Sequence, residues 1–171
     1  MRKPQPAPEI ALVAVADDDT FAHAYPDVPT LLCDPVVTGA HRDELEFFDA
    51  EGRRLNPVTG PTGELTGLRA GAGEPDPDAL RHRLARVVRH VETHLRARPE
   101  LVERFGIAPE AAIAALPDPE RLSLAETLAV LPHQDRPEVR RTAWWQPDVP
   151  AYAHSDGWFH NAMHAAGWTH P

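Results

Sequence analysis

DALRHRLARVVRHVETHLRAR, residues 78–98, carries the clearest structural pattern in the chain. Its apolar side chains recur every three or four positions, the spacing at which residues share one face of an α-helix. These side chains are Leu80, Leu84, Val87, Val88, Val91 and Leu95. Asp78 is a residue type that favours the N-cap of a helix, and Pro99 ends the pattern. We therefore expect a long amphipathic helix that buries one side against other elements.

The residues before this helix predict β-structure. EIALVAVA, residues 9–16, is a nearly unbroken apolar run and predicts a buried strand. Residues 21–29 contain two prolines and predict a loop or a single helical turn, and residues 30–37 predict a second short strand. Residues 45–58 have the pattern of a hairpin, with a turn in which Gly52 supplies a positive φ.

The whole chain is expected to form one α+β domain, because 171 residues suffice for a single core without disulfides. A small antiparallel sheet with a hairpin would occupy the N-terminal half, and helices the C-terminal half. Shorter helices are predicted at residues 100–105, 109–116 and 123–130. The expected parts are a β-rich part at 9–58, a linker at 59–77, a helical part at 78–131 and a proline-broken tail at 132–171 that folds back.

Charge and composition restrict the partners that we expect. The net charge is −9, and residues 1–78 hold fifteen acidic against six basic residues. This balance disfavours nucleic acid, since binding to a phosphate backbone depends on Lys and Arg. No apolar run is long enough for a membrane span, and the first ten residues lack the apolar core of a secretory signal. A cytoplasmic location follows as the expectation, and the single Cys33 is consistent with it. Sixteen arginines against one lysine indicate a GC-rich bacterial genome.

The tail contains the pattern H-x-x-G-W-x-H twice. His154 to His160 form the first copy and His164 to His170 the second. His160 and His164 lie four positions apart, the spacing at which one helix supplies two metal ligands. His154 or Asp156 would complete a three-ligand site for a divalent transition metal. The favoured alternative is structural, with Trp158 and Trp168 anchoring the tail on the core.

The same region offers residues for catalysis or ligand binding without a metal. His133 with Asp135, or His154 with Asp156, would form a His–carboxylate pair for general acid–base chemistry. Aromatic side chains would line the accompanying pocket: Trp144, Trp145, Tyr152, Trp158 and Trp168. For each His–carboxylate pair taken singly, the favoured interpretation is a pair of exposed loop residues.

The expected long helix is basic on its exposed face, with arginines at positions 81, 83, 86, 89, 96 and 98. The favoured interpretation is that this face packs beside the acidic β-rich part of the same chain. The alternative is that it binds an anionic substrate or an acidic partner. The run from Asp17 to Asp19 is expected to be a solvated acidic turn.

Three functions are consistent with these patterns. The first is a small non-catalytic binding or accessory protein, whose Trp/His-rich surface takes a small-molecule ligand or a protein partner. The second is a small enzyme with a His–carboxylate site, with or without a metal, in a Trp-lined pocket. The third is a metal-binding protein without catalysis. The order follows from the lack of a complete catalytic motif in the sequence.

Overall fold

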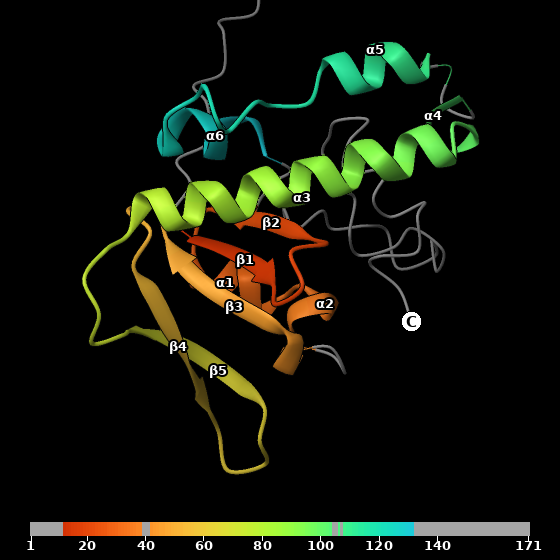
Figure 1. Ribbon diagram of the computed structural model, residues 1–171. Helices are drawn as coiled ribbons and strands as arrows, with labels where there is room; N and C mark the ends of the chain where they lie inside the picture. The colour runs from red at the N-terminus through yellow and green to blue at the C-terminus, as the bar shows by residue number, and fades with distance from the viewer. Residues whose placement is uncertain (1–11, 39–41, 104–105, 107, 132–171) are drawn as a thin grey trace, which may run out of the picture.

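The computed structural model describes residues 12–38, 42–103, 106 and 108–131. Within these ranges the chain forms a five-stranded antiparallel sheet with helices on both faces (Figure 1). The strand order is β2-β1-β3-β4-β5. The strands are β1 (Leu12–Ala16), β2 (Ala22–Tyr25), β3 (Leu45–Asp49), β4 (Arg54–Thr59) and β5 (Leu65–Ala70). A mixed α+β fold is therefore confirmed.

β1 is buried along its whole length because both faces of the sheet are covered. It pairs with β2 on one side, with Val13 opposite Ala24, and with β3 on the other, with Ala14 opposite Phe47. Successive side chains of a strand point to opposite faces, so the residues of β1 divide between two hydrophobic clusters. Val13 and Val15 belong to one cluster, and Leu12 and Ala14 to the other.

The first cluster is closed by α3 (Pro77–Ala97), which crosses one face of the sheet (Figure 1). The whole predicted apolar stripe of this helix is buried. Full burial of one such side chain stabilises the fold by roughly 1.5–3 kcal/mol, so the stripe is a main source of stability. The helices α4 (Glu100–Glu103), α5 (Pro109–Ala114) and α6 (Leu124–Val130) follow, and Ala112, Leu124 and Leu128 extend the cluster.

The second cluster lies on the opposite face of the sheet, around Phe47. It is covered by α1 (Val28–Leu32) and α2 (Pro35–Thr38), which contribute Leu31 and Val37. A short 3₁₀ turn, Arg42–Glu44, leads from there into β3. The sheet is thus the middle of three layers, and a side chain on either face of β1 or β2 is enclosed.

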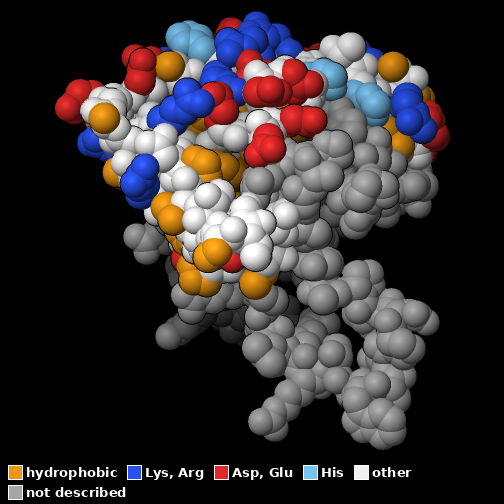
Figure 2. Space-filling view, turned by 90° about the horizontal axis from the view of Figure 1, so that it is seen from below, with side chains coloured by type: hydrophobic (Ala, Val, Ile, Leu, Met, Phe, Trp, Pro, Cys, Tyr) orange, Lys and Arg blue, Asp and Glu red, His pale blue; other side chains and the backbone are white. Residues whose placement is uncertain are grey.

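β4 and β5 form a two-stranded ribbon that extends away from α3, while Leu65 of β5 still packs in the second cluster beside α1 (Figure 1). β3 pairs with β4 only at Phe47–Leu55 and Phe48–Arg54, whereas five residue pairs join β4 to β5. The sequence between Arg54 and Glu64 contains no charged residue. In Figure 2, which views the molecule from below, white and hydrophobic surface dominates the lower part of the coloured region.

Several sequence predictions agree with this structure. β1 lies within the strand predicted at 9–16, and the hairpin at 45–58 is confirmed, with Gly52 at φ +85°. The long helix is confirmed as well, although its N-cap is Asp76, whose carboxylate accepts a hydrogen bond from the Ala79 amide at 2.9 Å. The shorter helices are also present, and α5 ends two residues earlier than predicted. The last two residues of the helix predicted at 100–105 lie outside the described residues.

Other predictions of secondary structure were wrong. Residues 30–37 form parts of two helices rather than a strand, because the Asp27 carboxylate caps α1 by accepting from the Thr30 amide at 2.8 Å. The loop predicted at 21–29 contains β2, and the linker predicted at 59–77 contains β5. Both strands are short, and pairing with a neighbouring strand decides the conformation. The tail at 132–171 lies outside the described residues.

No helix in the described part of the chain has the length and apolar character required to cross a bilayer.

Candidate functional site

A buried polar cluster lies between β2 and the helices α1 and α2. His23 and Tyr25 are two positions apart on β2, so both point to the face that α1 and α2 cover. Asp34 stands in the turn between these helices, where its backbone carbonyl accepts from the Val37 amide at 3.1 Å. All three residues are less than 5% exposed. The fold therefore brings an imidazole, a phenol and a carboxyl group together in the interior.

The hydrogen bonds of this cluster define a direction of donation. The Tyr25 hydroxyl donates to Asp34 Oδ2 at 2.7 Å. His23 Nδ1 lies 3.1 Å from Tyr25 Oη and 3.3 Å from Asp34 Oδ2. Since the phenolic hydrogen is committed to the carboxylate, which only accepts, His23 Nδ1 must carry a hydrogen and donate. Burial, and next the charge of the Asp34 carboxylate, raise the pKa of Tyr25 well above its ordinary value of 10.0.

This geometry suits a structural clamp. A buried polar group must be hydrogen-bonded, and here each of the three groups helps to satisfy the others. The cluster ties the edge strand β2 to the α1–α2 turn and adds a polar connection to the apolar contacts of these short helices. General acid–base chemistry would need a path by which a substrate reaches His23, and the side chain is 3% exposed.

The basic face of α3 is neutralised within the chain. Arg83 lies against Asp19 and Glu46, and Arg86 also contacts Asp19. The remaining arginines of the helix and its C-cap pair with acidic residues close by: Arg81 with Asp78, Arg89 with Glu120, Arg96 with Glu92 and Arg98 with Glu100. The favoured prediction, that this face packs beside the acidic β-rich part, is thus confirmed for Arg83 and Arg86. The other four arginines pair with acidic residues of the helical part instead.

The acidic turn after β1 has a more specific role than the sequence predicted. Asp19 adopts a left-handed backbone conformation, with φ 58°, and its side chain is only 12% exposed. Its carboxylate binds two arginines of α3, so it joins the sheet to the helix. Asp18 accepts hydrogen bonds from Thr20 and is exposed, as is Asp17. The prediction of a solvated acidic turn is therefore confirmed for Asp17 and Asp18 and wrong for Asp19.

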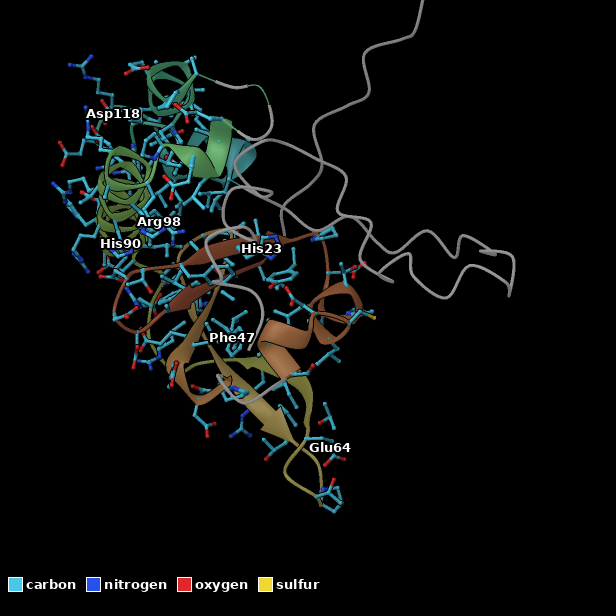
Figure 3. All side chains as sticks on the ribbon, turned by 90° about the vertical axis from the view of Figure 1, so that its right-hand side faces the viewer. His23, Phe47, Glu64, His90, Arg98 and Asp118 are labelled. Atoms are coloured by element: carbon cyan, nitrogen blue, oxygen red, sulfur yellow. The ribbon has the colours of Figure 1, made fainter. Side chains whose placement is uncertain are left out.

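A groove is open to solvent on the helical side of the molecule. It lies between α3, the end of α5 and the segment that leads to α6, and its volume is about 340 Å³. Its floor is apolar and consists of Ala85, Val88, Ile113, Leu116, Pro117 and Pro119. Four charged residues complete the lining: Arg89, Glu92, Asp118 and Glu120. In Figure 3, Asp118 marks the groove on the helical layer, distant from His23 and Phe47 on the sheet.

The rim of the groove is held by exposed ion pairs. Arg89 Nη1 on α3 donates to Glu120 Oε1 at 3.3 Å, and both side chains are more than 60% exposed. Glu92 pairs with Arg96 at 2.7 Å, and Asp118 pairs with Arg121 at 3.2 Å. The backbone amides of Arg121 and Leu122 donate to the Asp118 carbonyl, which fixes the turn that forms one wall.

The site residues predicted from the sequence lie outside the described part of the chain. They are His133, Asp135, Trp144, Trp145, Tyr152, His154, Asp156, Trp158, His160, His164 and Trp168. Their roles as catalytic, ligand-binding or metal-ligating residues stay predictions. Over the described ranges, no three His, Cys, Asp or Glu side chains form a group that could hold a metal ion.

Sequence reasoning missed both the buried cluster and the groove. The alternation in AHAY, residues 22–25, was a signal for a strand with His23 and Tyr25 on one face, although it is only four residues long. Nothing in the sequence indicated that Asp34 would meet them, because its position depends on the turn between α1 and α2. The groove depends likewise on how α5 and the turn at Asp118 pack beside α3.

Comparison of the chain with protein-family models, with curated proteins and with solved structures finds no match.

Proposed function

We propose that this protein is a small non-catalytic binding protein that holds a ligand in the groove between α3 and α5. The observation that carries the proposal is the groove itself, an open hollow of about 340 Å³ with an apolar floor and a charged rim. Small-molecule sites commonly have volumes of roughly 300–1,000 Å³ and combine apolar walls with a few polar groups. The apolar floor would supply affinity, and the rim would orient the ligand.

Two other parts of the described chain carry polar or charged side chains that a functional site could use: the buried cluster around His23 and the arginines of α3. The contacts of both favour the groove as the binding site. His23, Tyr25 and Asp34 are buried and hydrogen-bond to one another, which favours a structural role over acid–base chemistry. The arginines of α3 each contact a carboxylate of the same chain, which disfavours binding of an anion along the helix. The groove, in contrast, is open to solvent and is lined by both charged and apolar residues.

The proposal keeps the first of the three functions that the sequence suggested, a non-catalytic binding protein. It differs in the binding surface, which is now proposed to lie on the helical layer. A contribution from the tail, through Trp158, Trp168 or the histidines at 154, 160 and 164, stays a separate prediction. Purified protein without a histidine tag would test the metal-binding alternative. Stoichiometric zinc, copper or iron that is lost in a His160→Ala/His164→Ala variant would favour it.

The groove is tested by nuclear magnetic resonance with a neutral apolar probe. Titration of hexan-1-ol into the ¹⁵N-labelled full chain should shift the amide signals of Ala85, Val88 and Ile113. Ile113 is partly buried at the floor, so Ile113→Trp should fill the groove and weaken these shifts at least fivefold.

The matched control is Ala111→Trp, which adds the same ring to an exposed position of the same helix. This variant should bind the probe as the unmodified chain does. Shifts that scatter over the surface, or that persist unchanged in Ile113→Trp, would contradict the proposed function.

A further inference from the structure

We infer that the groove between α3 and α5 is the docking site of a segment of the same chain, residues 157–171, and that a ligand must displace this segment in order to bind. The inference rests on the proposed function, since it concerns the regulation of the same groove. Three features carry it: the balance of charge in the groove, the composition of the segment and the point at which the tail begins.

The charges at the rim of the groove are balanced within the chain. Each of the three carboxylates in the lining is paired with an arginine: Glu92 with Arg96, Asp118 with Arg121 and Glu120 with Arg89. A charged group that entered the groove would have to compete with these pairs for a partner, and it would lose hydration in doing so. The apolar floor, in contrast, gains from being covered. The groove therefore favours an occupant that is uncharged and apolar.

The end of the chain has this character. Residues 157–171, GWFHNAMHAAGWTHP, form the longest run in the sequence without Asp, Glu, Lys or Arg. The large apolar side chains of this segment are Trp158, Phe159, Met163 and Trp168. An indole combines a broad apolar ring with one N–H donor, so it matches a groove with aliphatic residues on its floor and carboxylates at its rim. The anchoring of the tail that the sequence predicts for Trp158 and Trp168 would thus take place in this groove.

The tail begins close enough to the groove to reach it. Residues 117–120 belong to the lining, and α6, whose seven residues rise by about 10 Å, lies between them and Leu131. Residues 132–156 then join Leu131 to the segment, and 25 residues span up to about 80 Å when extended. Because the segment belongs to the same chain, its docking does not depend on the concentration of the protein.

The size of the groove makes the segment and a ligand exclude each other. Its volume of about 340 Å³ is at the lower end of the range for one small-molecule site, roughly 300–1,000 Å³. A ligand therefore binds only those molecules from which the segment has left. Its apparent affinity is reduced to the same fraction.

A double variant of the segment tests the docking. In the ¹⁵N-labelled full chain, Trp158→Ala/Trp168→Ala should shift the amide signals of Ala85, Val88 and Ile113, here called the groove signals. The reason is that these lining residues lose the aromatic ring that covers them. Groove signals that stay unchanged in this variant would overturn the inference.

The matched control removes the other two indoles of the tail. Trp144→Ala/Trp145→Ala makes the same chemical change outside the segment and should leave the groove signals where they are. Equal shifts in the two double variants would show a general effect of the tail and would likewise overturn the inference.

Titration of hexan-1-ol measures the competition. Its dissociation constant should be about fivefold lower in Trp158→Ala/Trp168→Ala than in the unmodified chain, which corresponds to a groove that the segment occupies in about 80% of the molecules. The control variant should bind hexan-1-ol as the unmodified chain does.

Dilution separates docking within one molecule from docking between two copies. The groove signals of the unmodified chain should stay constant on dilution, because the segment and the groove belong to one molecule. Signals that move on dilution towards those of Trp158→Ala/Trp168→Ala would show that a second copy supplies the segment, and would overturn the inference.

The outcomes separate this inference from the proposed function. Equal binding of hexan-1-ol by all three chains would overturn the inference and leave the groove as a binding site. Failure of hexan-1-ol to bind any of them would overturn the proposed function, and the groove signals of the double variants would still decide whether the segment docks.

Discussion

Arg83 Nε donates to Asp19 Oδ1 at 2.6 Å across 64 positions of sequence. The same guanidinium donates to the Ala16 carbonyl at 2.7 Å and contacts Glu46, and it lies over the Phe48 ring. One side chain of α3 thus binds the end of β1, the turn that follows it and the middle of β3. The contacts of Arg83 fix the position of α3 along the sheet. The apolar stripe determines which face of α3 packs on the sheet.

Replacing Arg83 by methionine should lower the free energy of unfolding by about 2–3 kcal/mol, because hydrogen bonds between charged groups are lost at a site that is 15% exposed. Methionine keeps an unbranched apolar side chain but removes the guanidinium that lies over the Phe48 ring, so the change reports on the interactions of the charged group. Urea denaturation followed by circular dichroism measures the difference. Arg96→Met removes an exposed pair of the same helix and should cost less than about 0.5 kcal/mol. Equal losses in the two variants would show that Arg83 has no special role.

Gly52 and Gly63 have nearly the same backbone conformation, with φ +85° and +83°, and very different surroundings. A Cβ atom at position 52 would lie 2.7 Å from the Asp76 carbonyl oxygen, whereas one at position 63 would meet no atom within 4 Å. Gly63→Ala should therefore cost about 1 kcal/mol, the penalty of the left-handed conformation. Gly52→Ala should cost about 2 kcal/mol more, because the turn must move away from the start of α3. Thermal unfolding of both variants checks the difference, and similar melting temperatures would contradict it.

The raised pKa of Tyr25 predicts a loss of stability at alkaline pH. The phenol keeps its hydrogen in the folded chain and loses it near pH 10 in the unfolded chain. Its contribution is therefore fully present below pH 10 and is lost as the pH rises through the folded pKa. Tyr25→Phe should cost about 1–2 kcal/mol at neutral pH and should show a weaker further decline above pH 10. Urea denaturation at several pH values measures this, with Tyr152→Phe as the comparison. Parallel declines in Tyr25→Phe and the unmodified chain would contradict the prediction.

Ser123 and Glu126 form a capping box at the start of α6, with Ser123 Oγ donating to Glu126 Oε2 at 2.7 Å. This hydrogen bond, together with that from the Ser123 backbone amide, lowers the pKa of Glu126 below 4.5. The contribution of Glu126 to stability is thus present above pH 4.5 and is lost as the pH falls. Ser123→Ala should cost about 1 kcal/mol and should raise the pKa of Glu126 towards 4.5. Carbon-detected titration of the Glu126 carboxyl group measures the shift, and an unchanged pKa would exclude the side-chain contact.

The elements that could be predicted from sequence are those whose pattern is local. The apolar stripe of α3 repeats at one period along a helix of 21 residues, and Gly52 indicates the turn of the β3–β4 hairpin. The region from 21 to 38 was mistaken because its conformation depends on partners that are not neighbours: β2 exists by pairing with β1, and α1 depends on the Asp27 cap. The groove and the cluster around Asp34 were not predictable for the same reason, since each is assembled from elements that meet only in the folded chain.

The ribbon of β4 and β5 makes the molecule adaptable to engineering. Glu64, beside the ribbon tip, and Asp118, in the groove, lie at opposite ends of the molecule (Figure 3). The chain at Gly63 has open space around it, so an affinity peptide or a fluorescent domain inserted there would extend into solvent without disturbing the core. Immobilised through the ribbon, the protein would present its helical layer and the groove to any library of ligands.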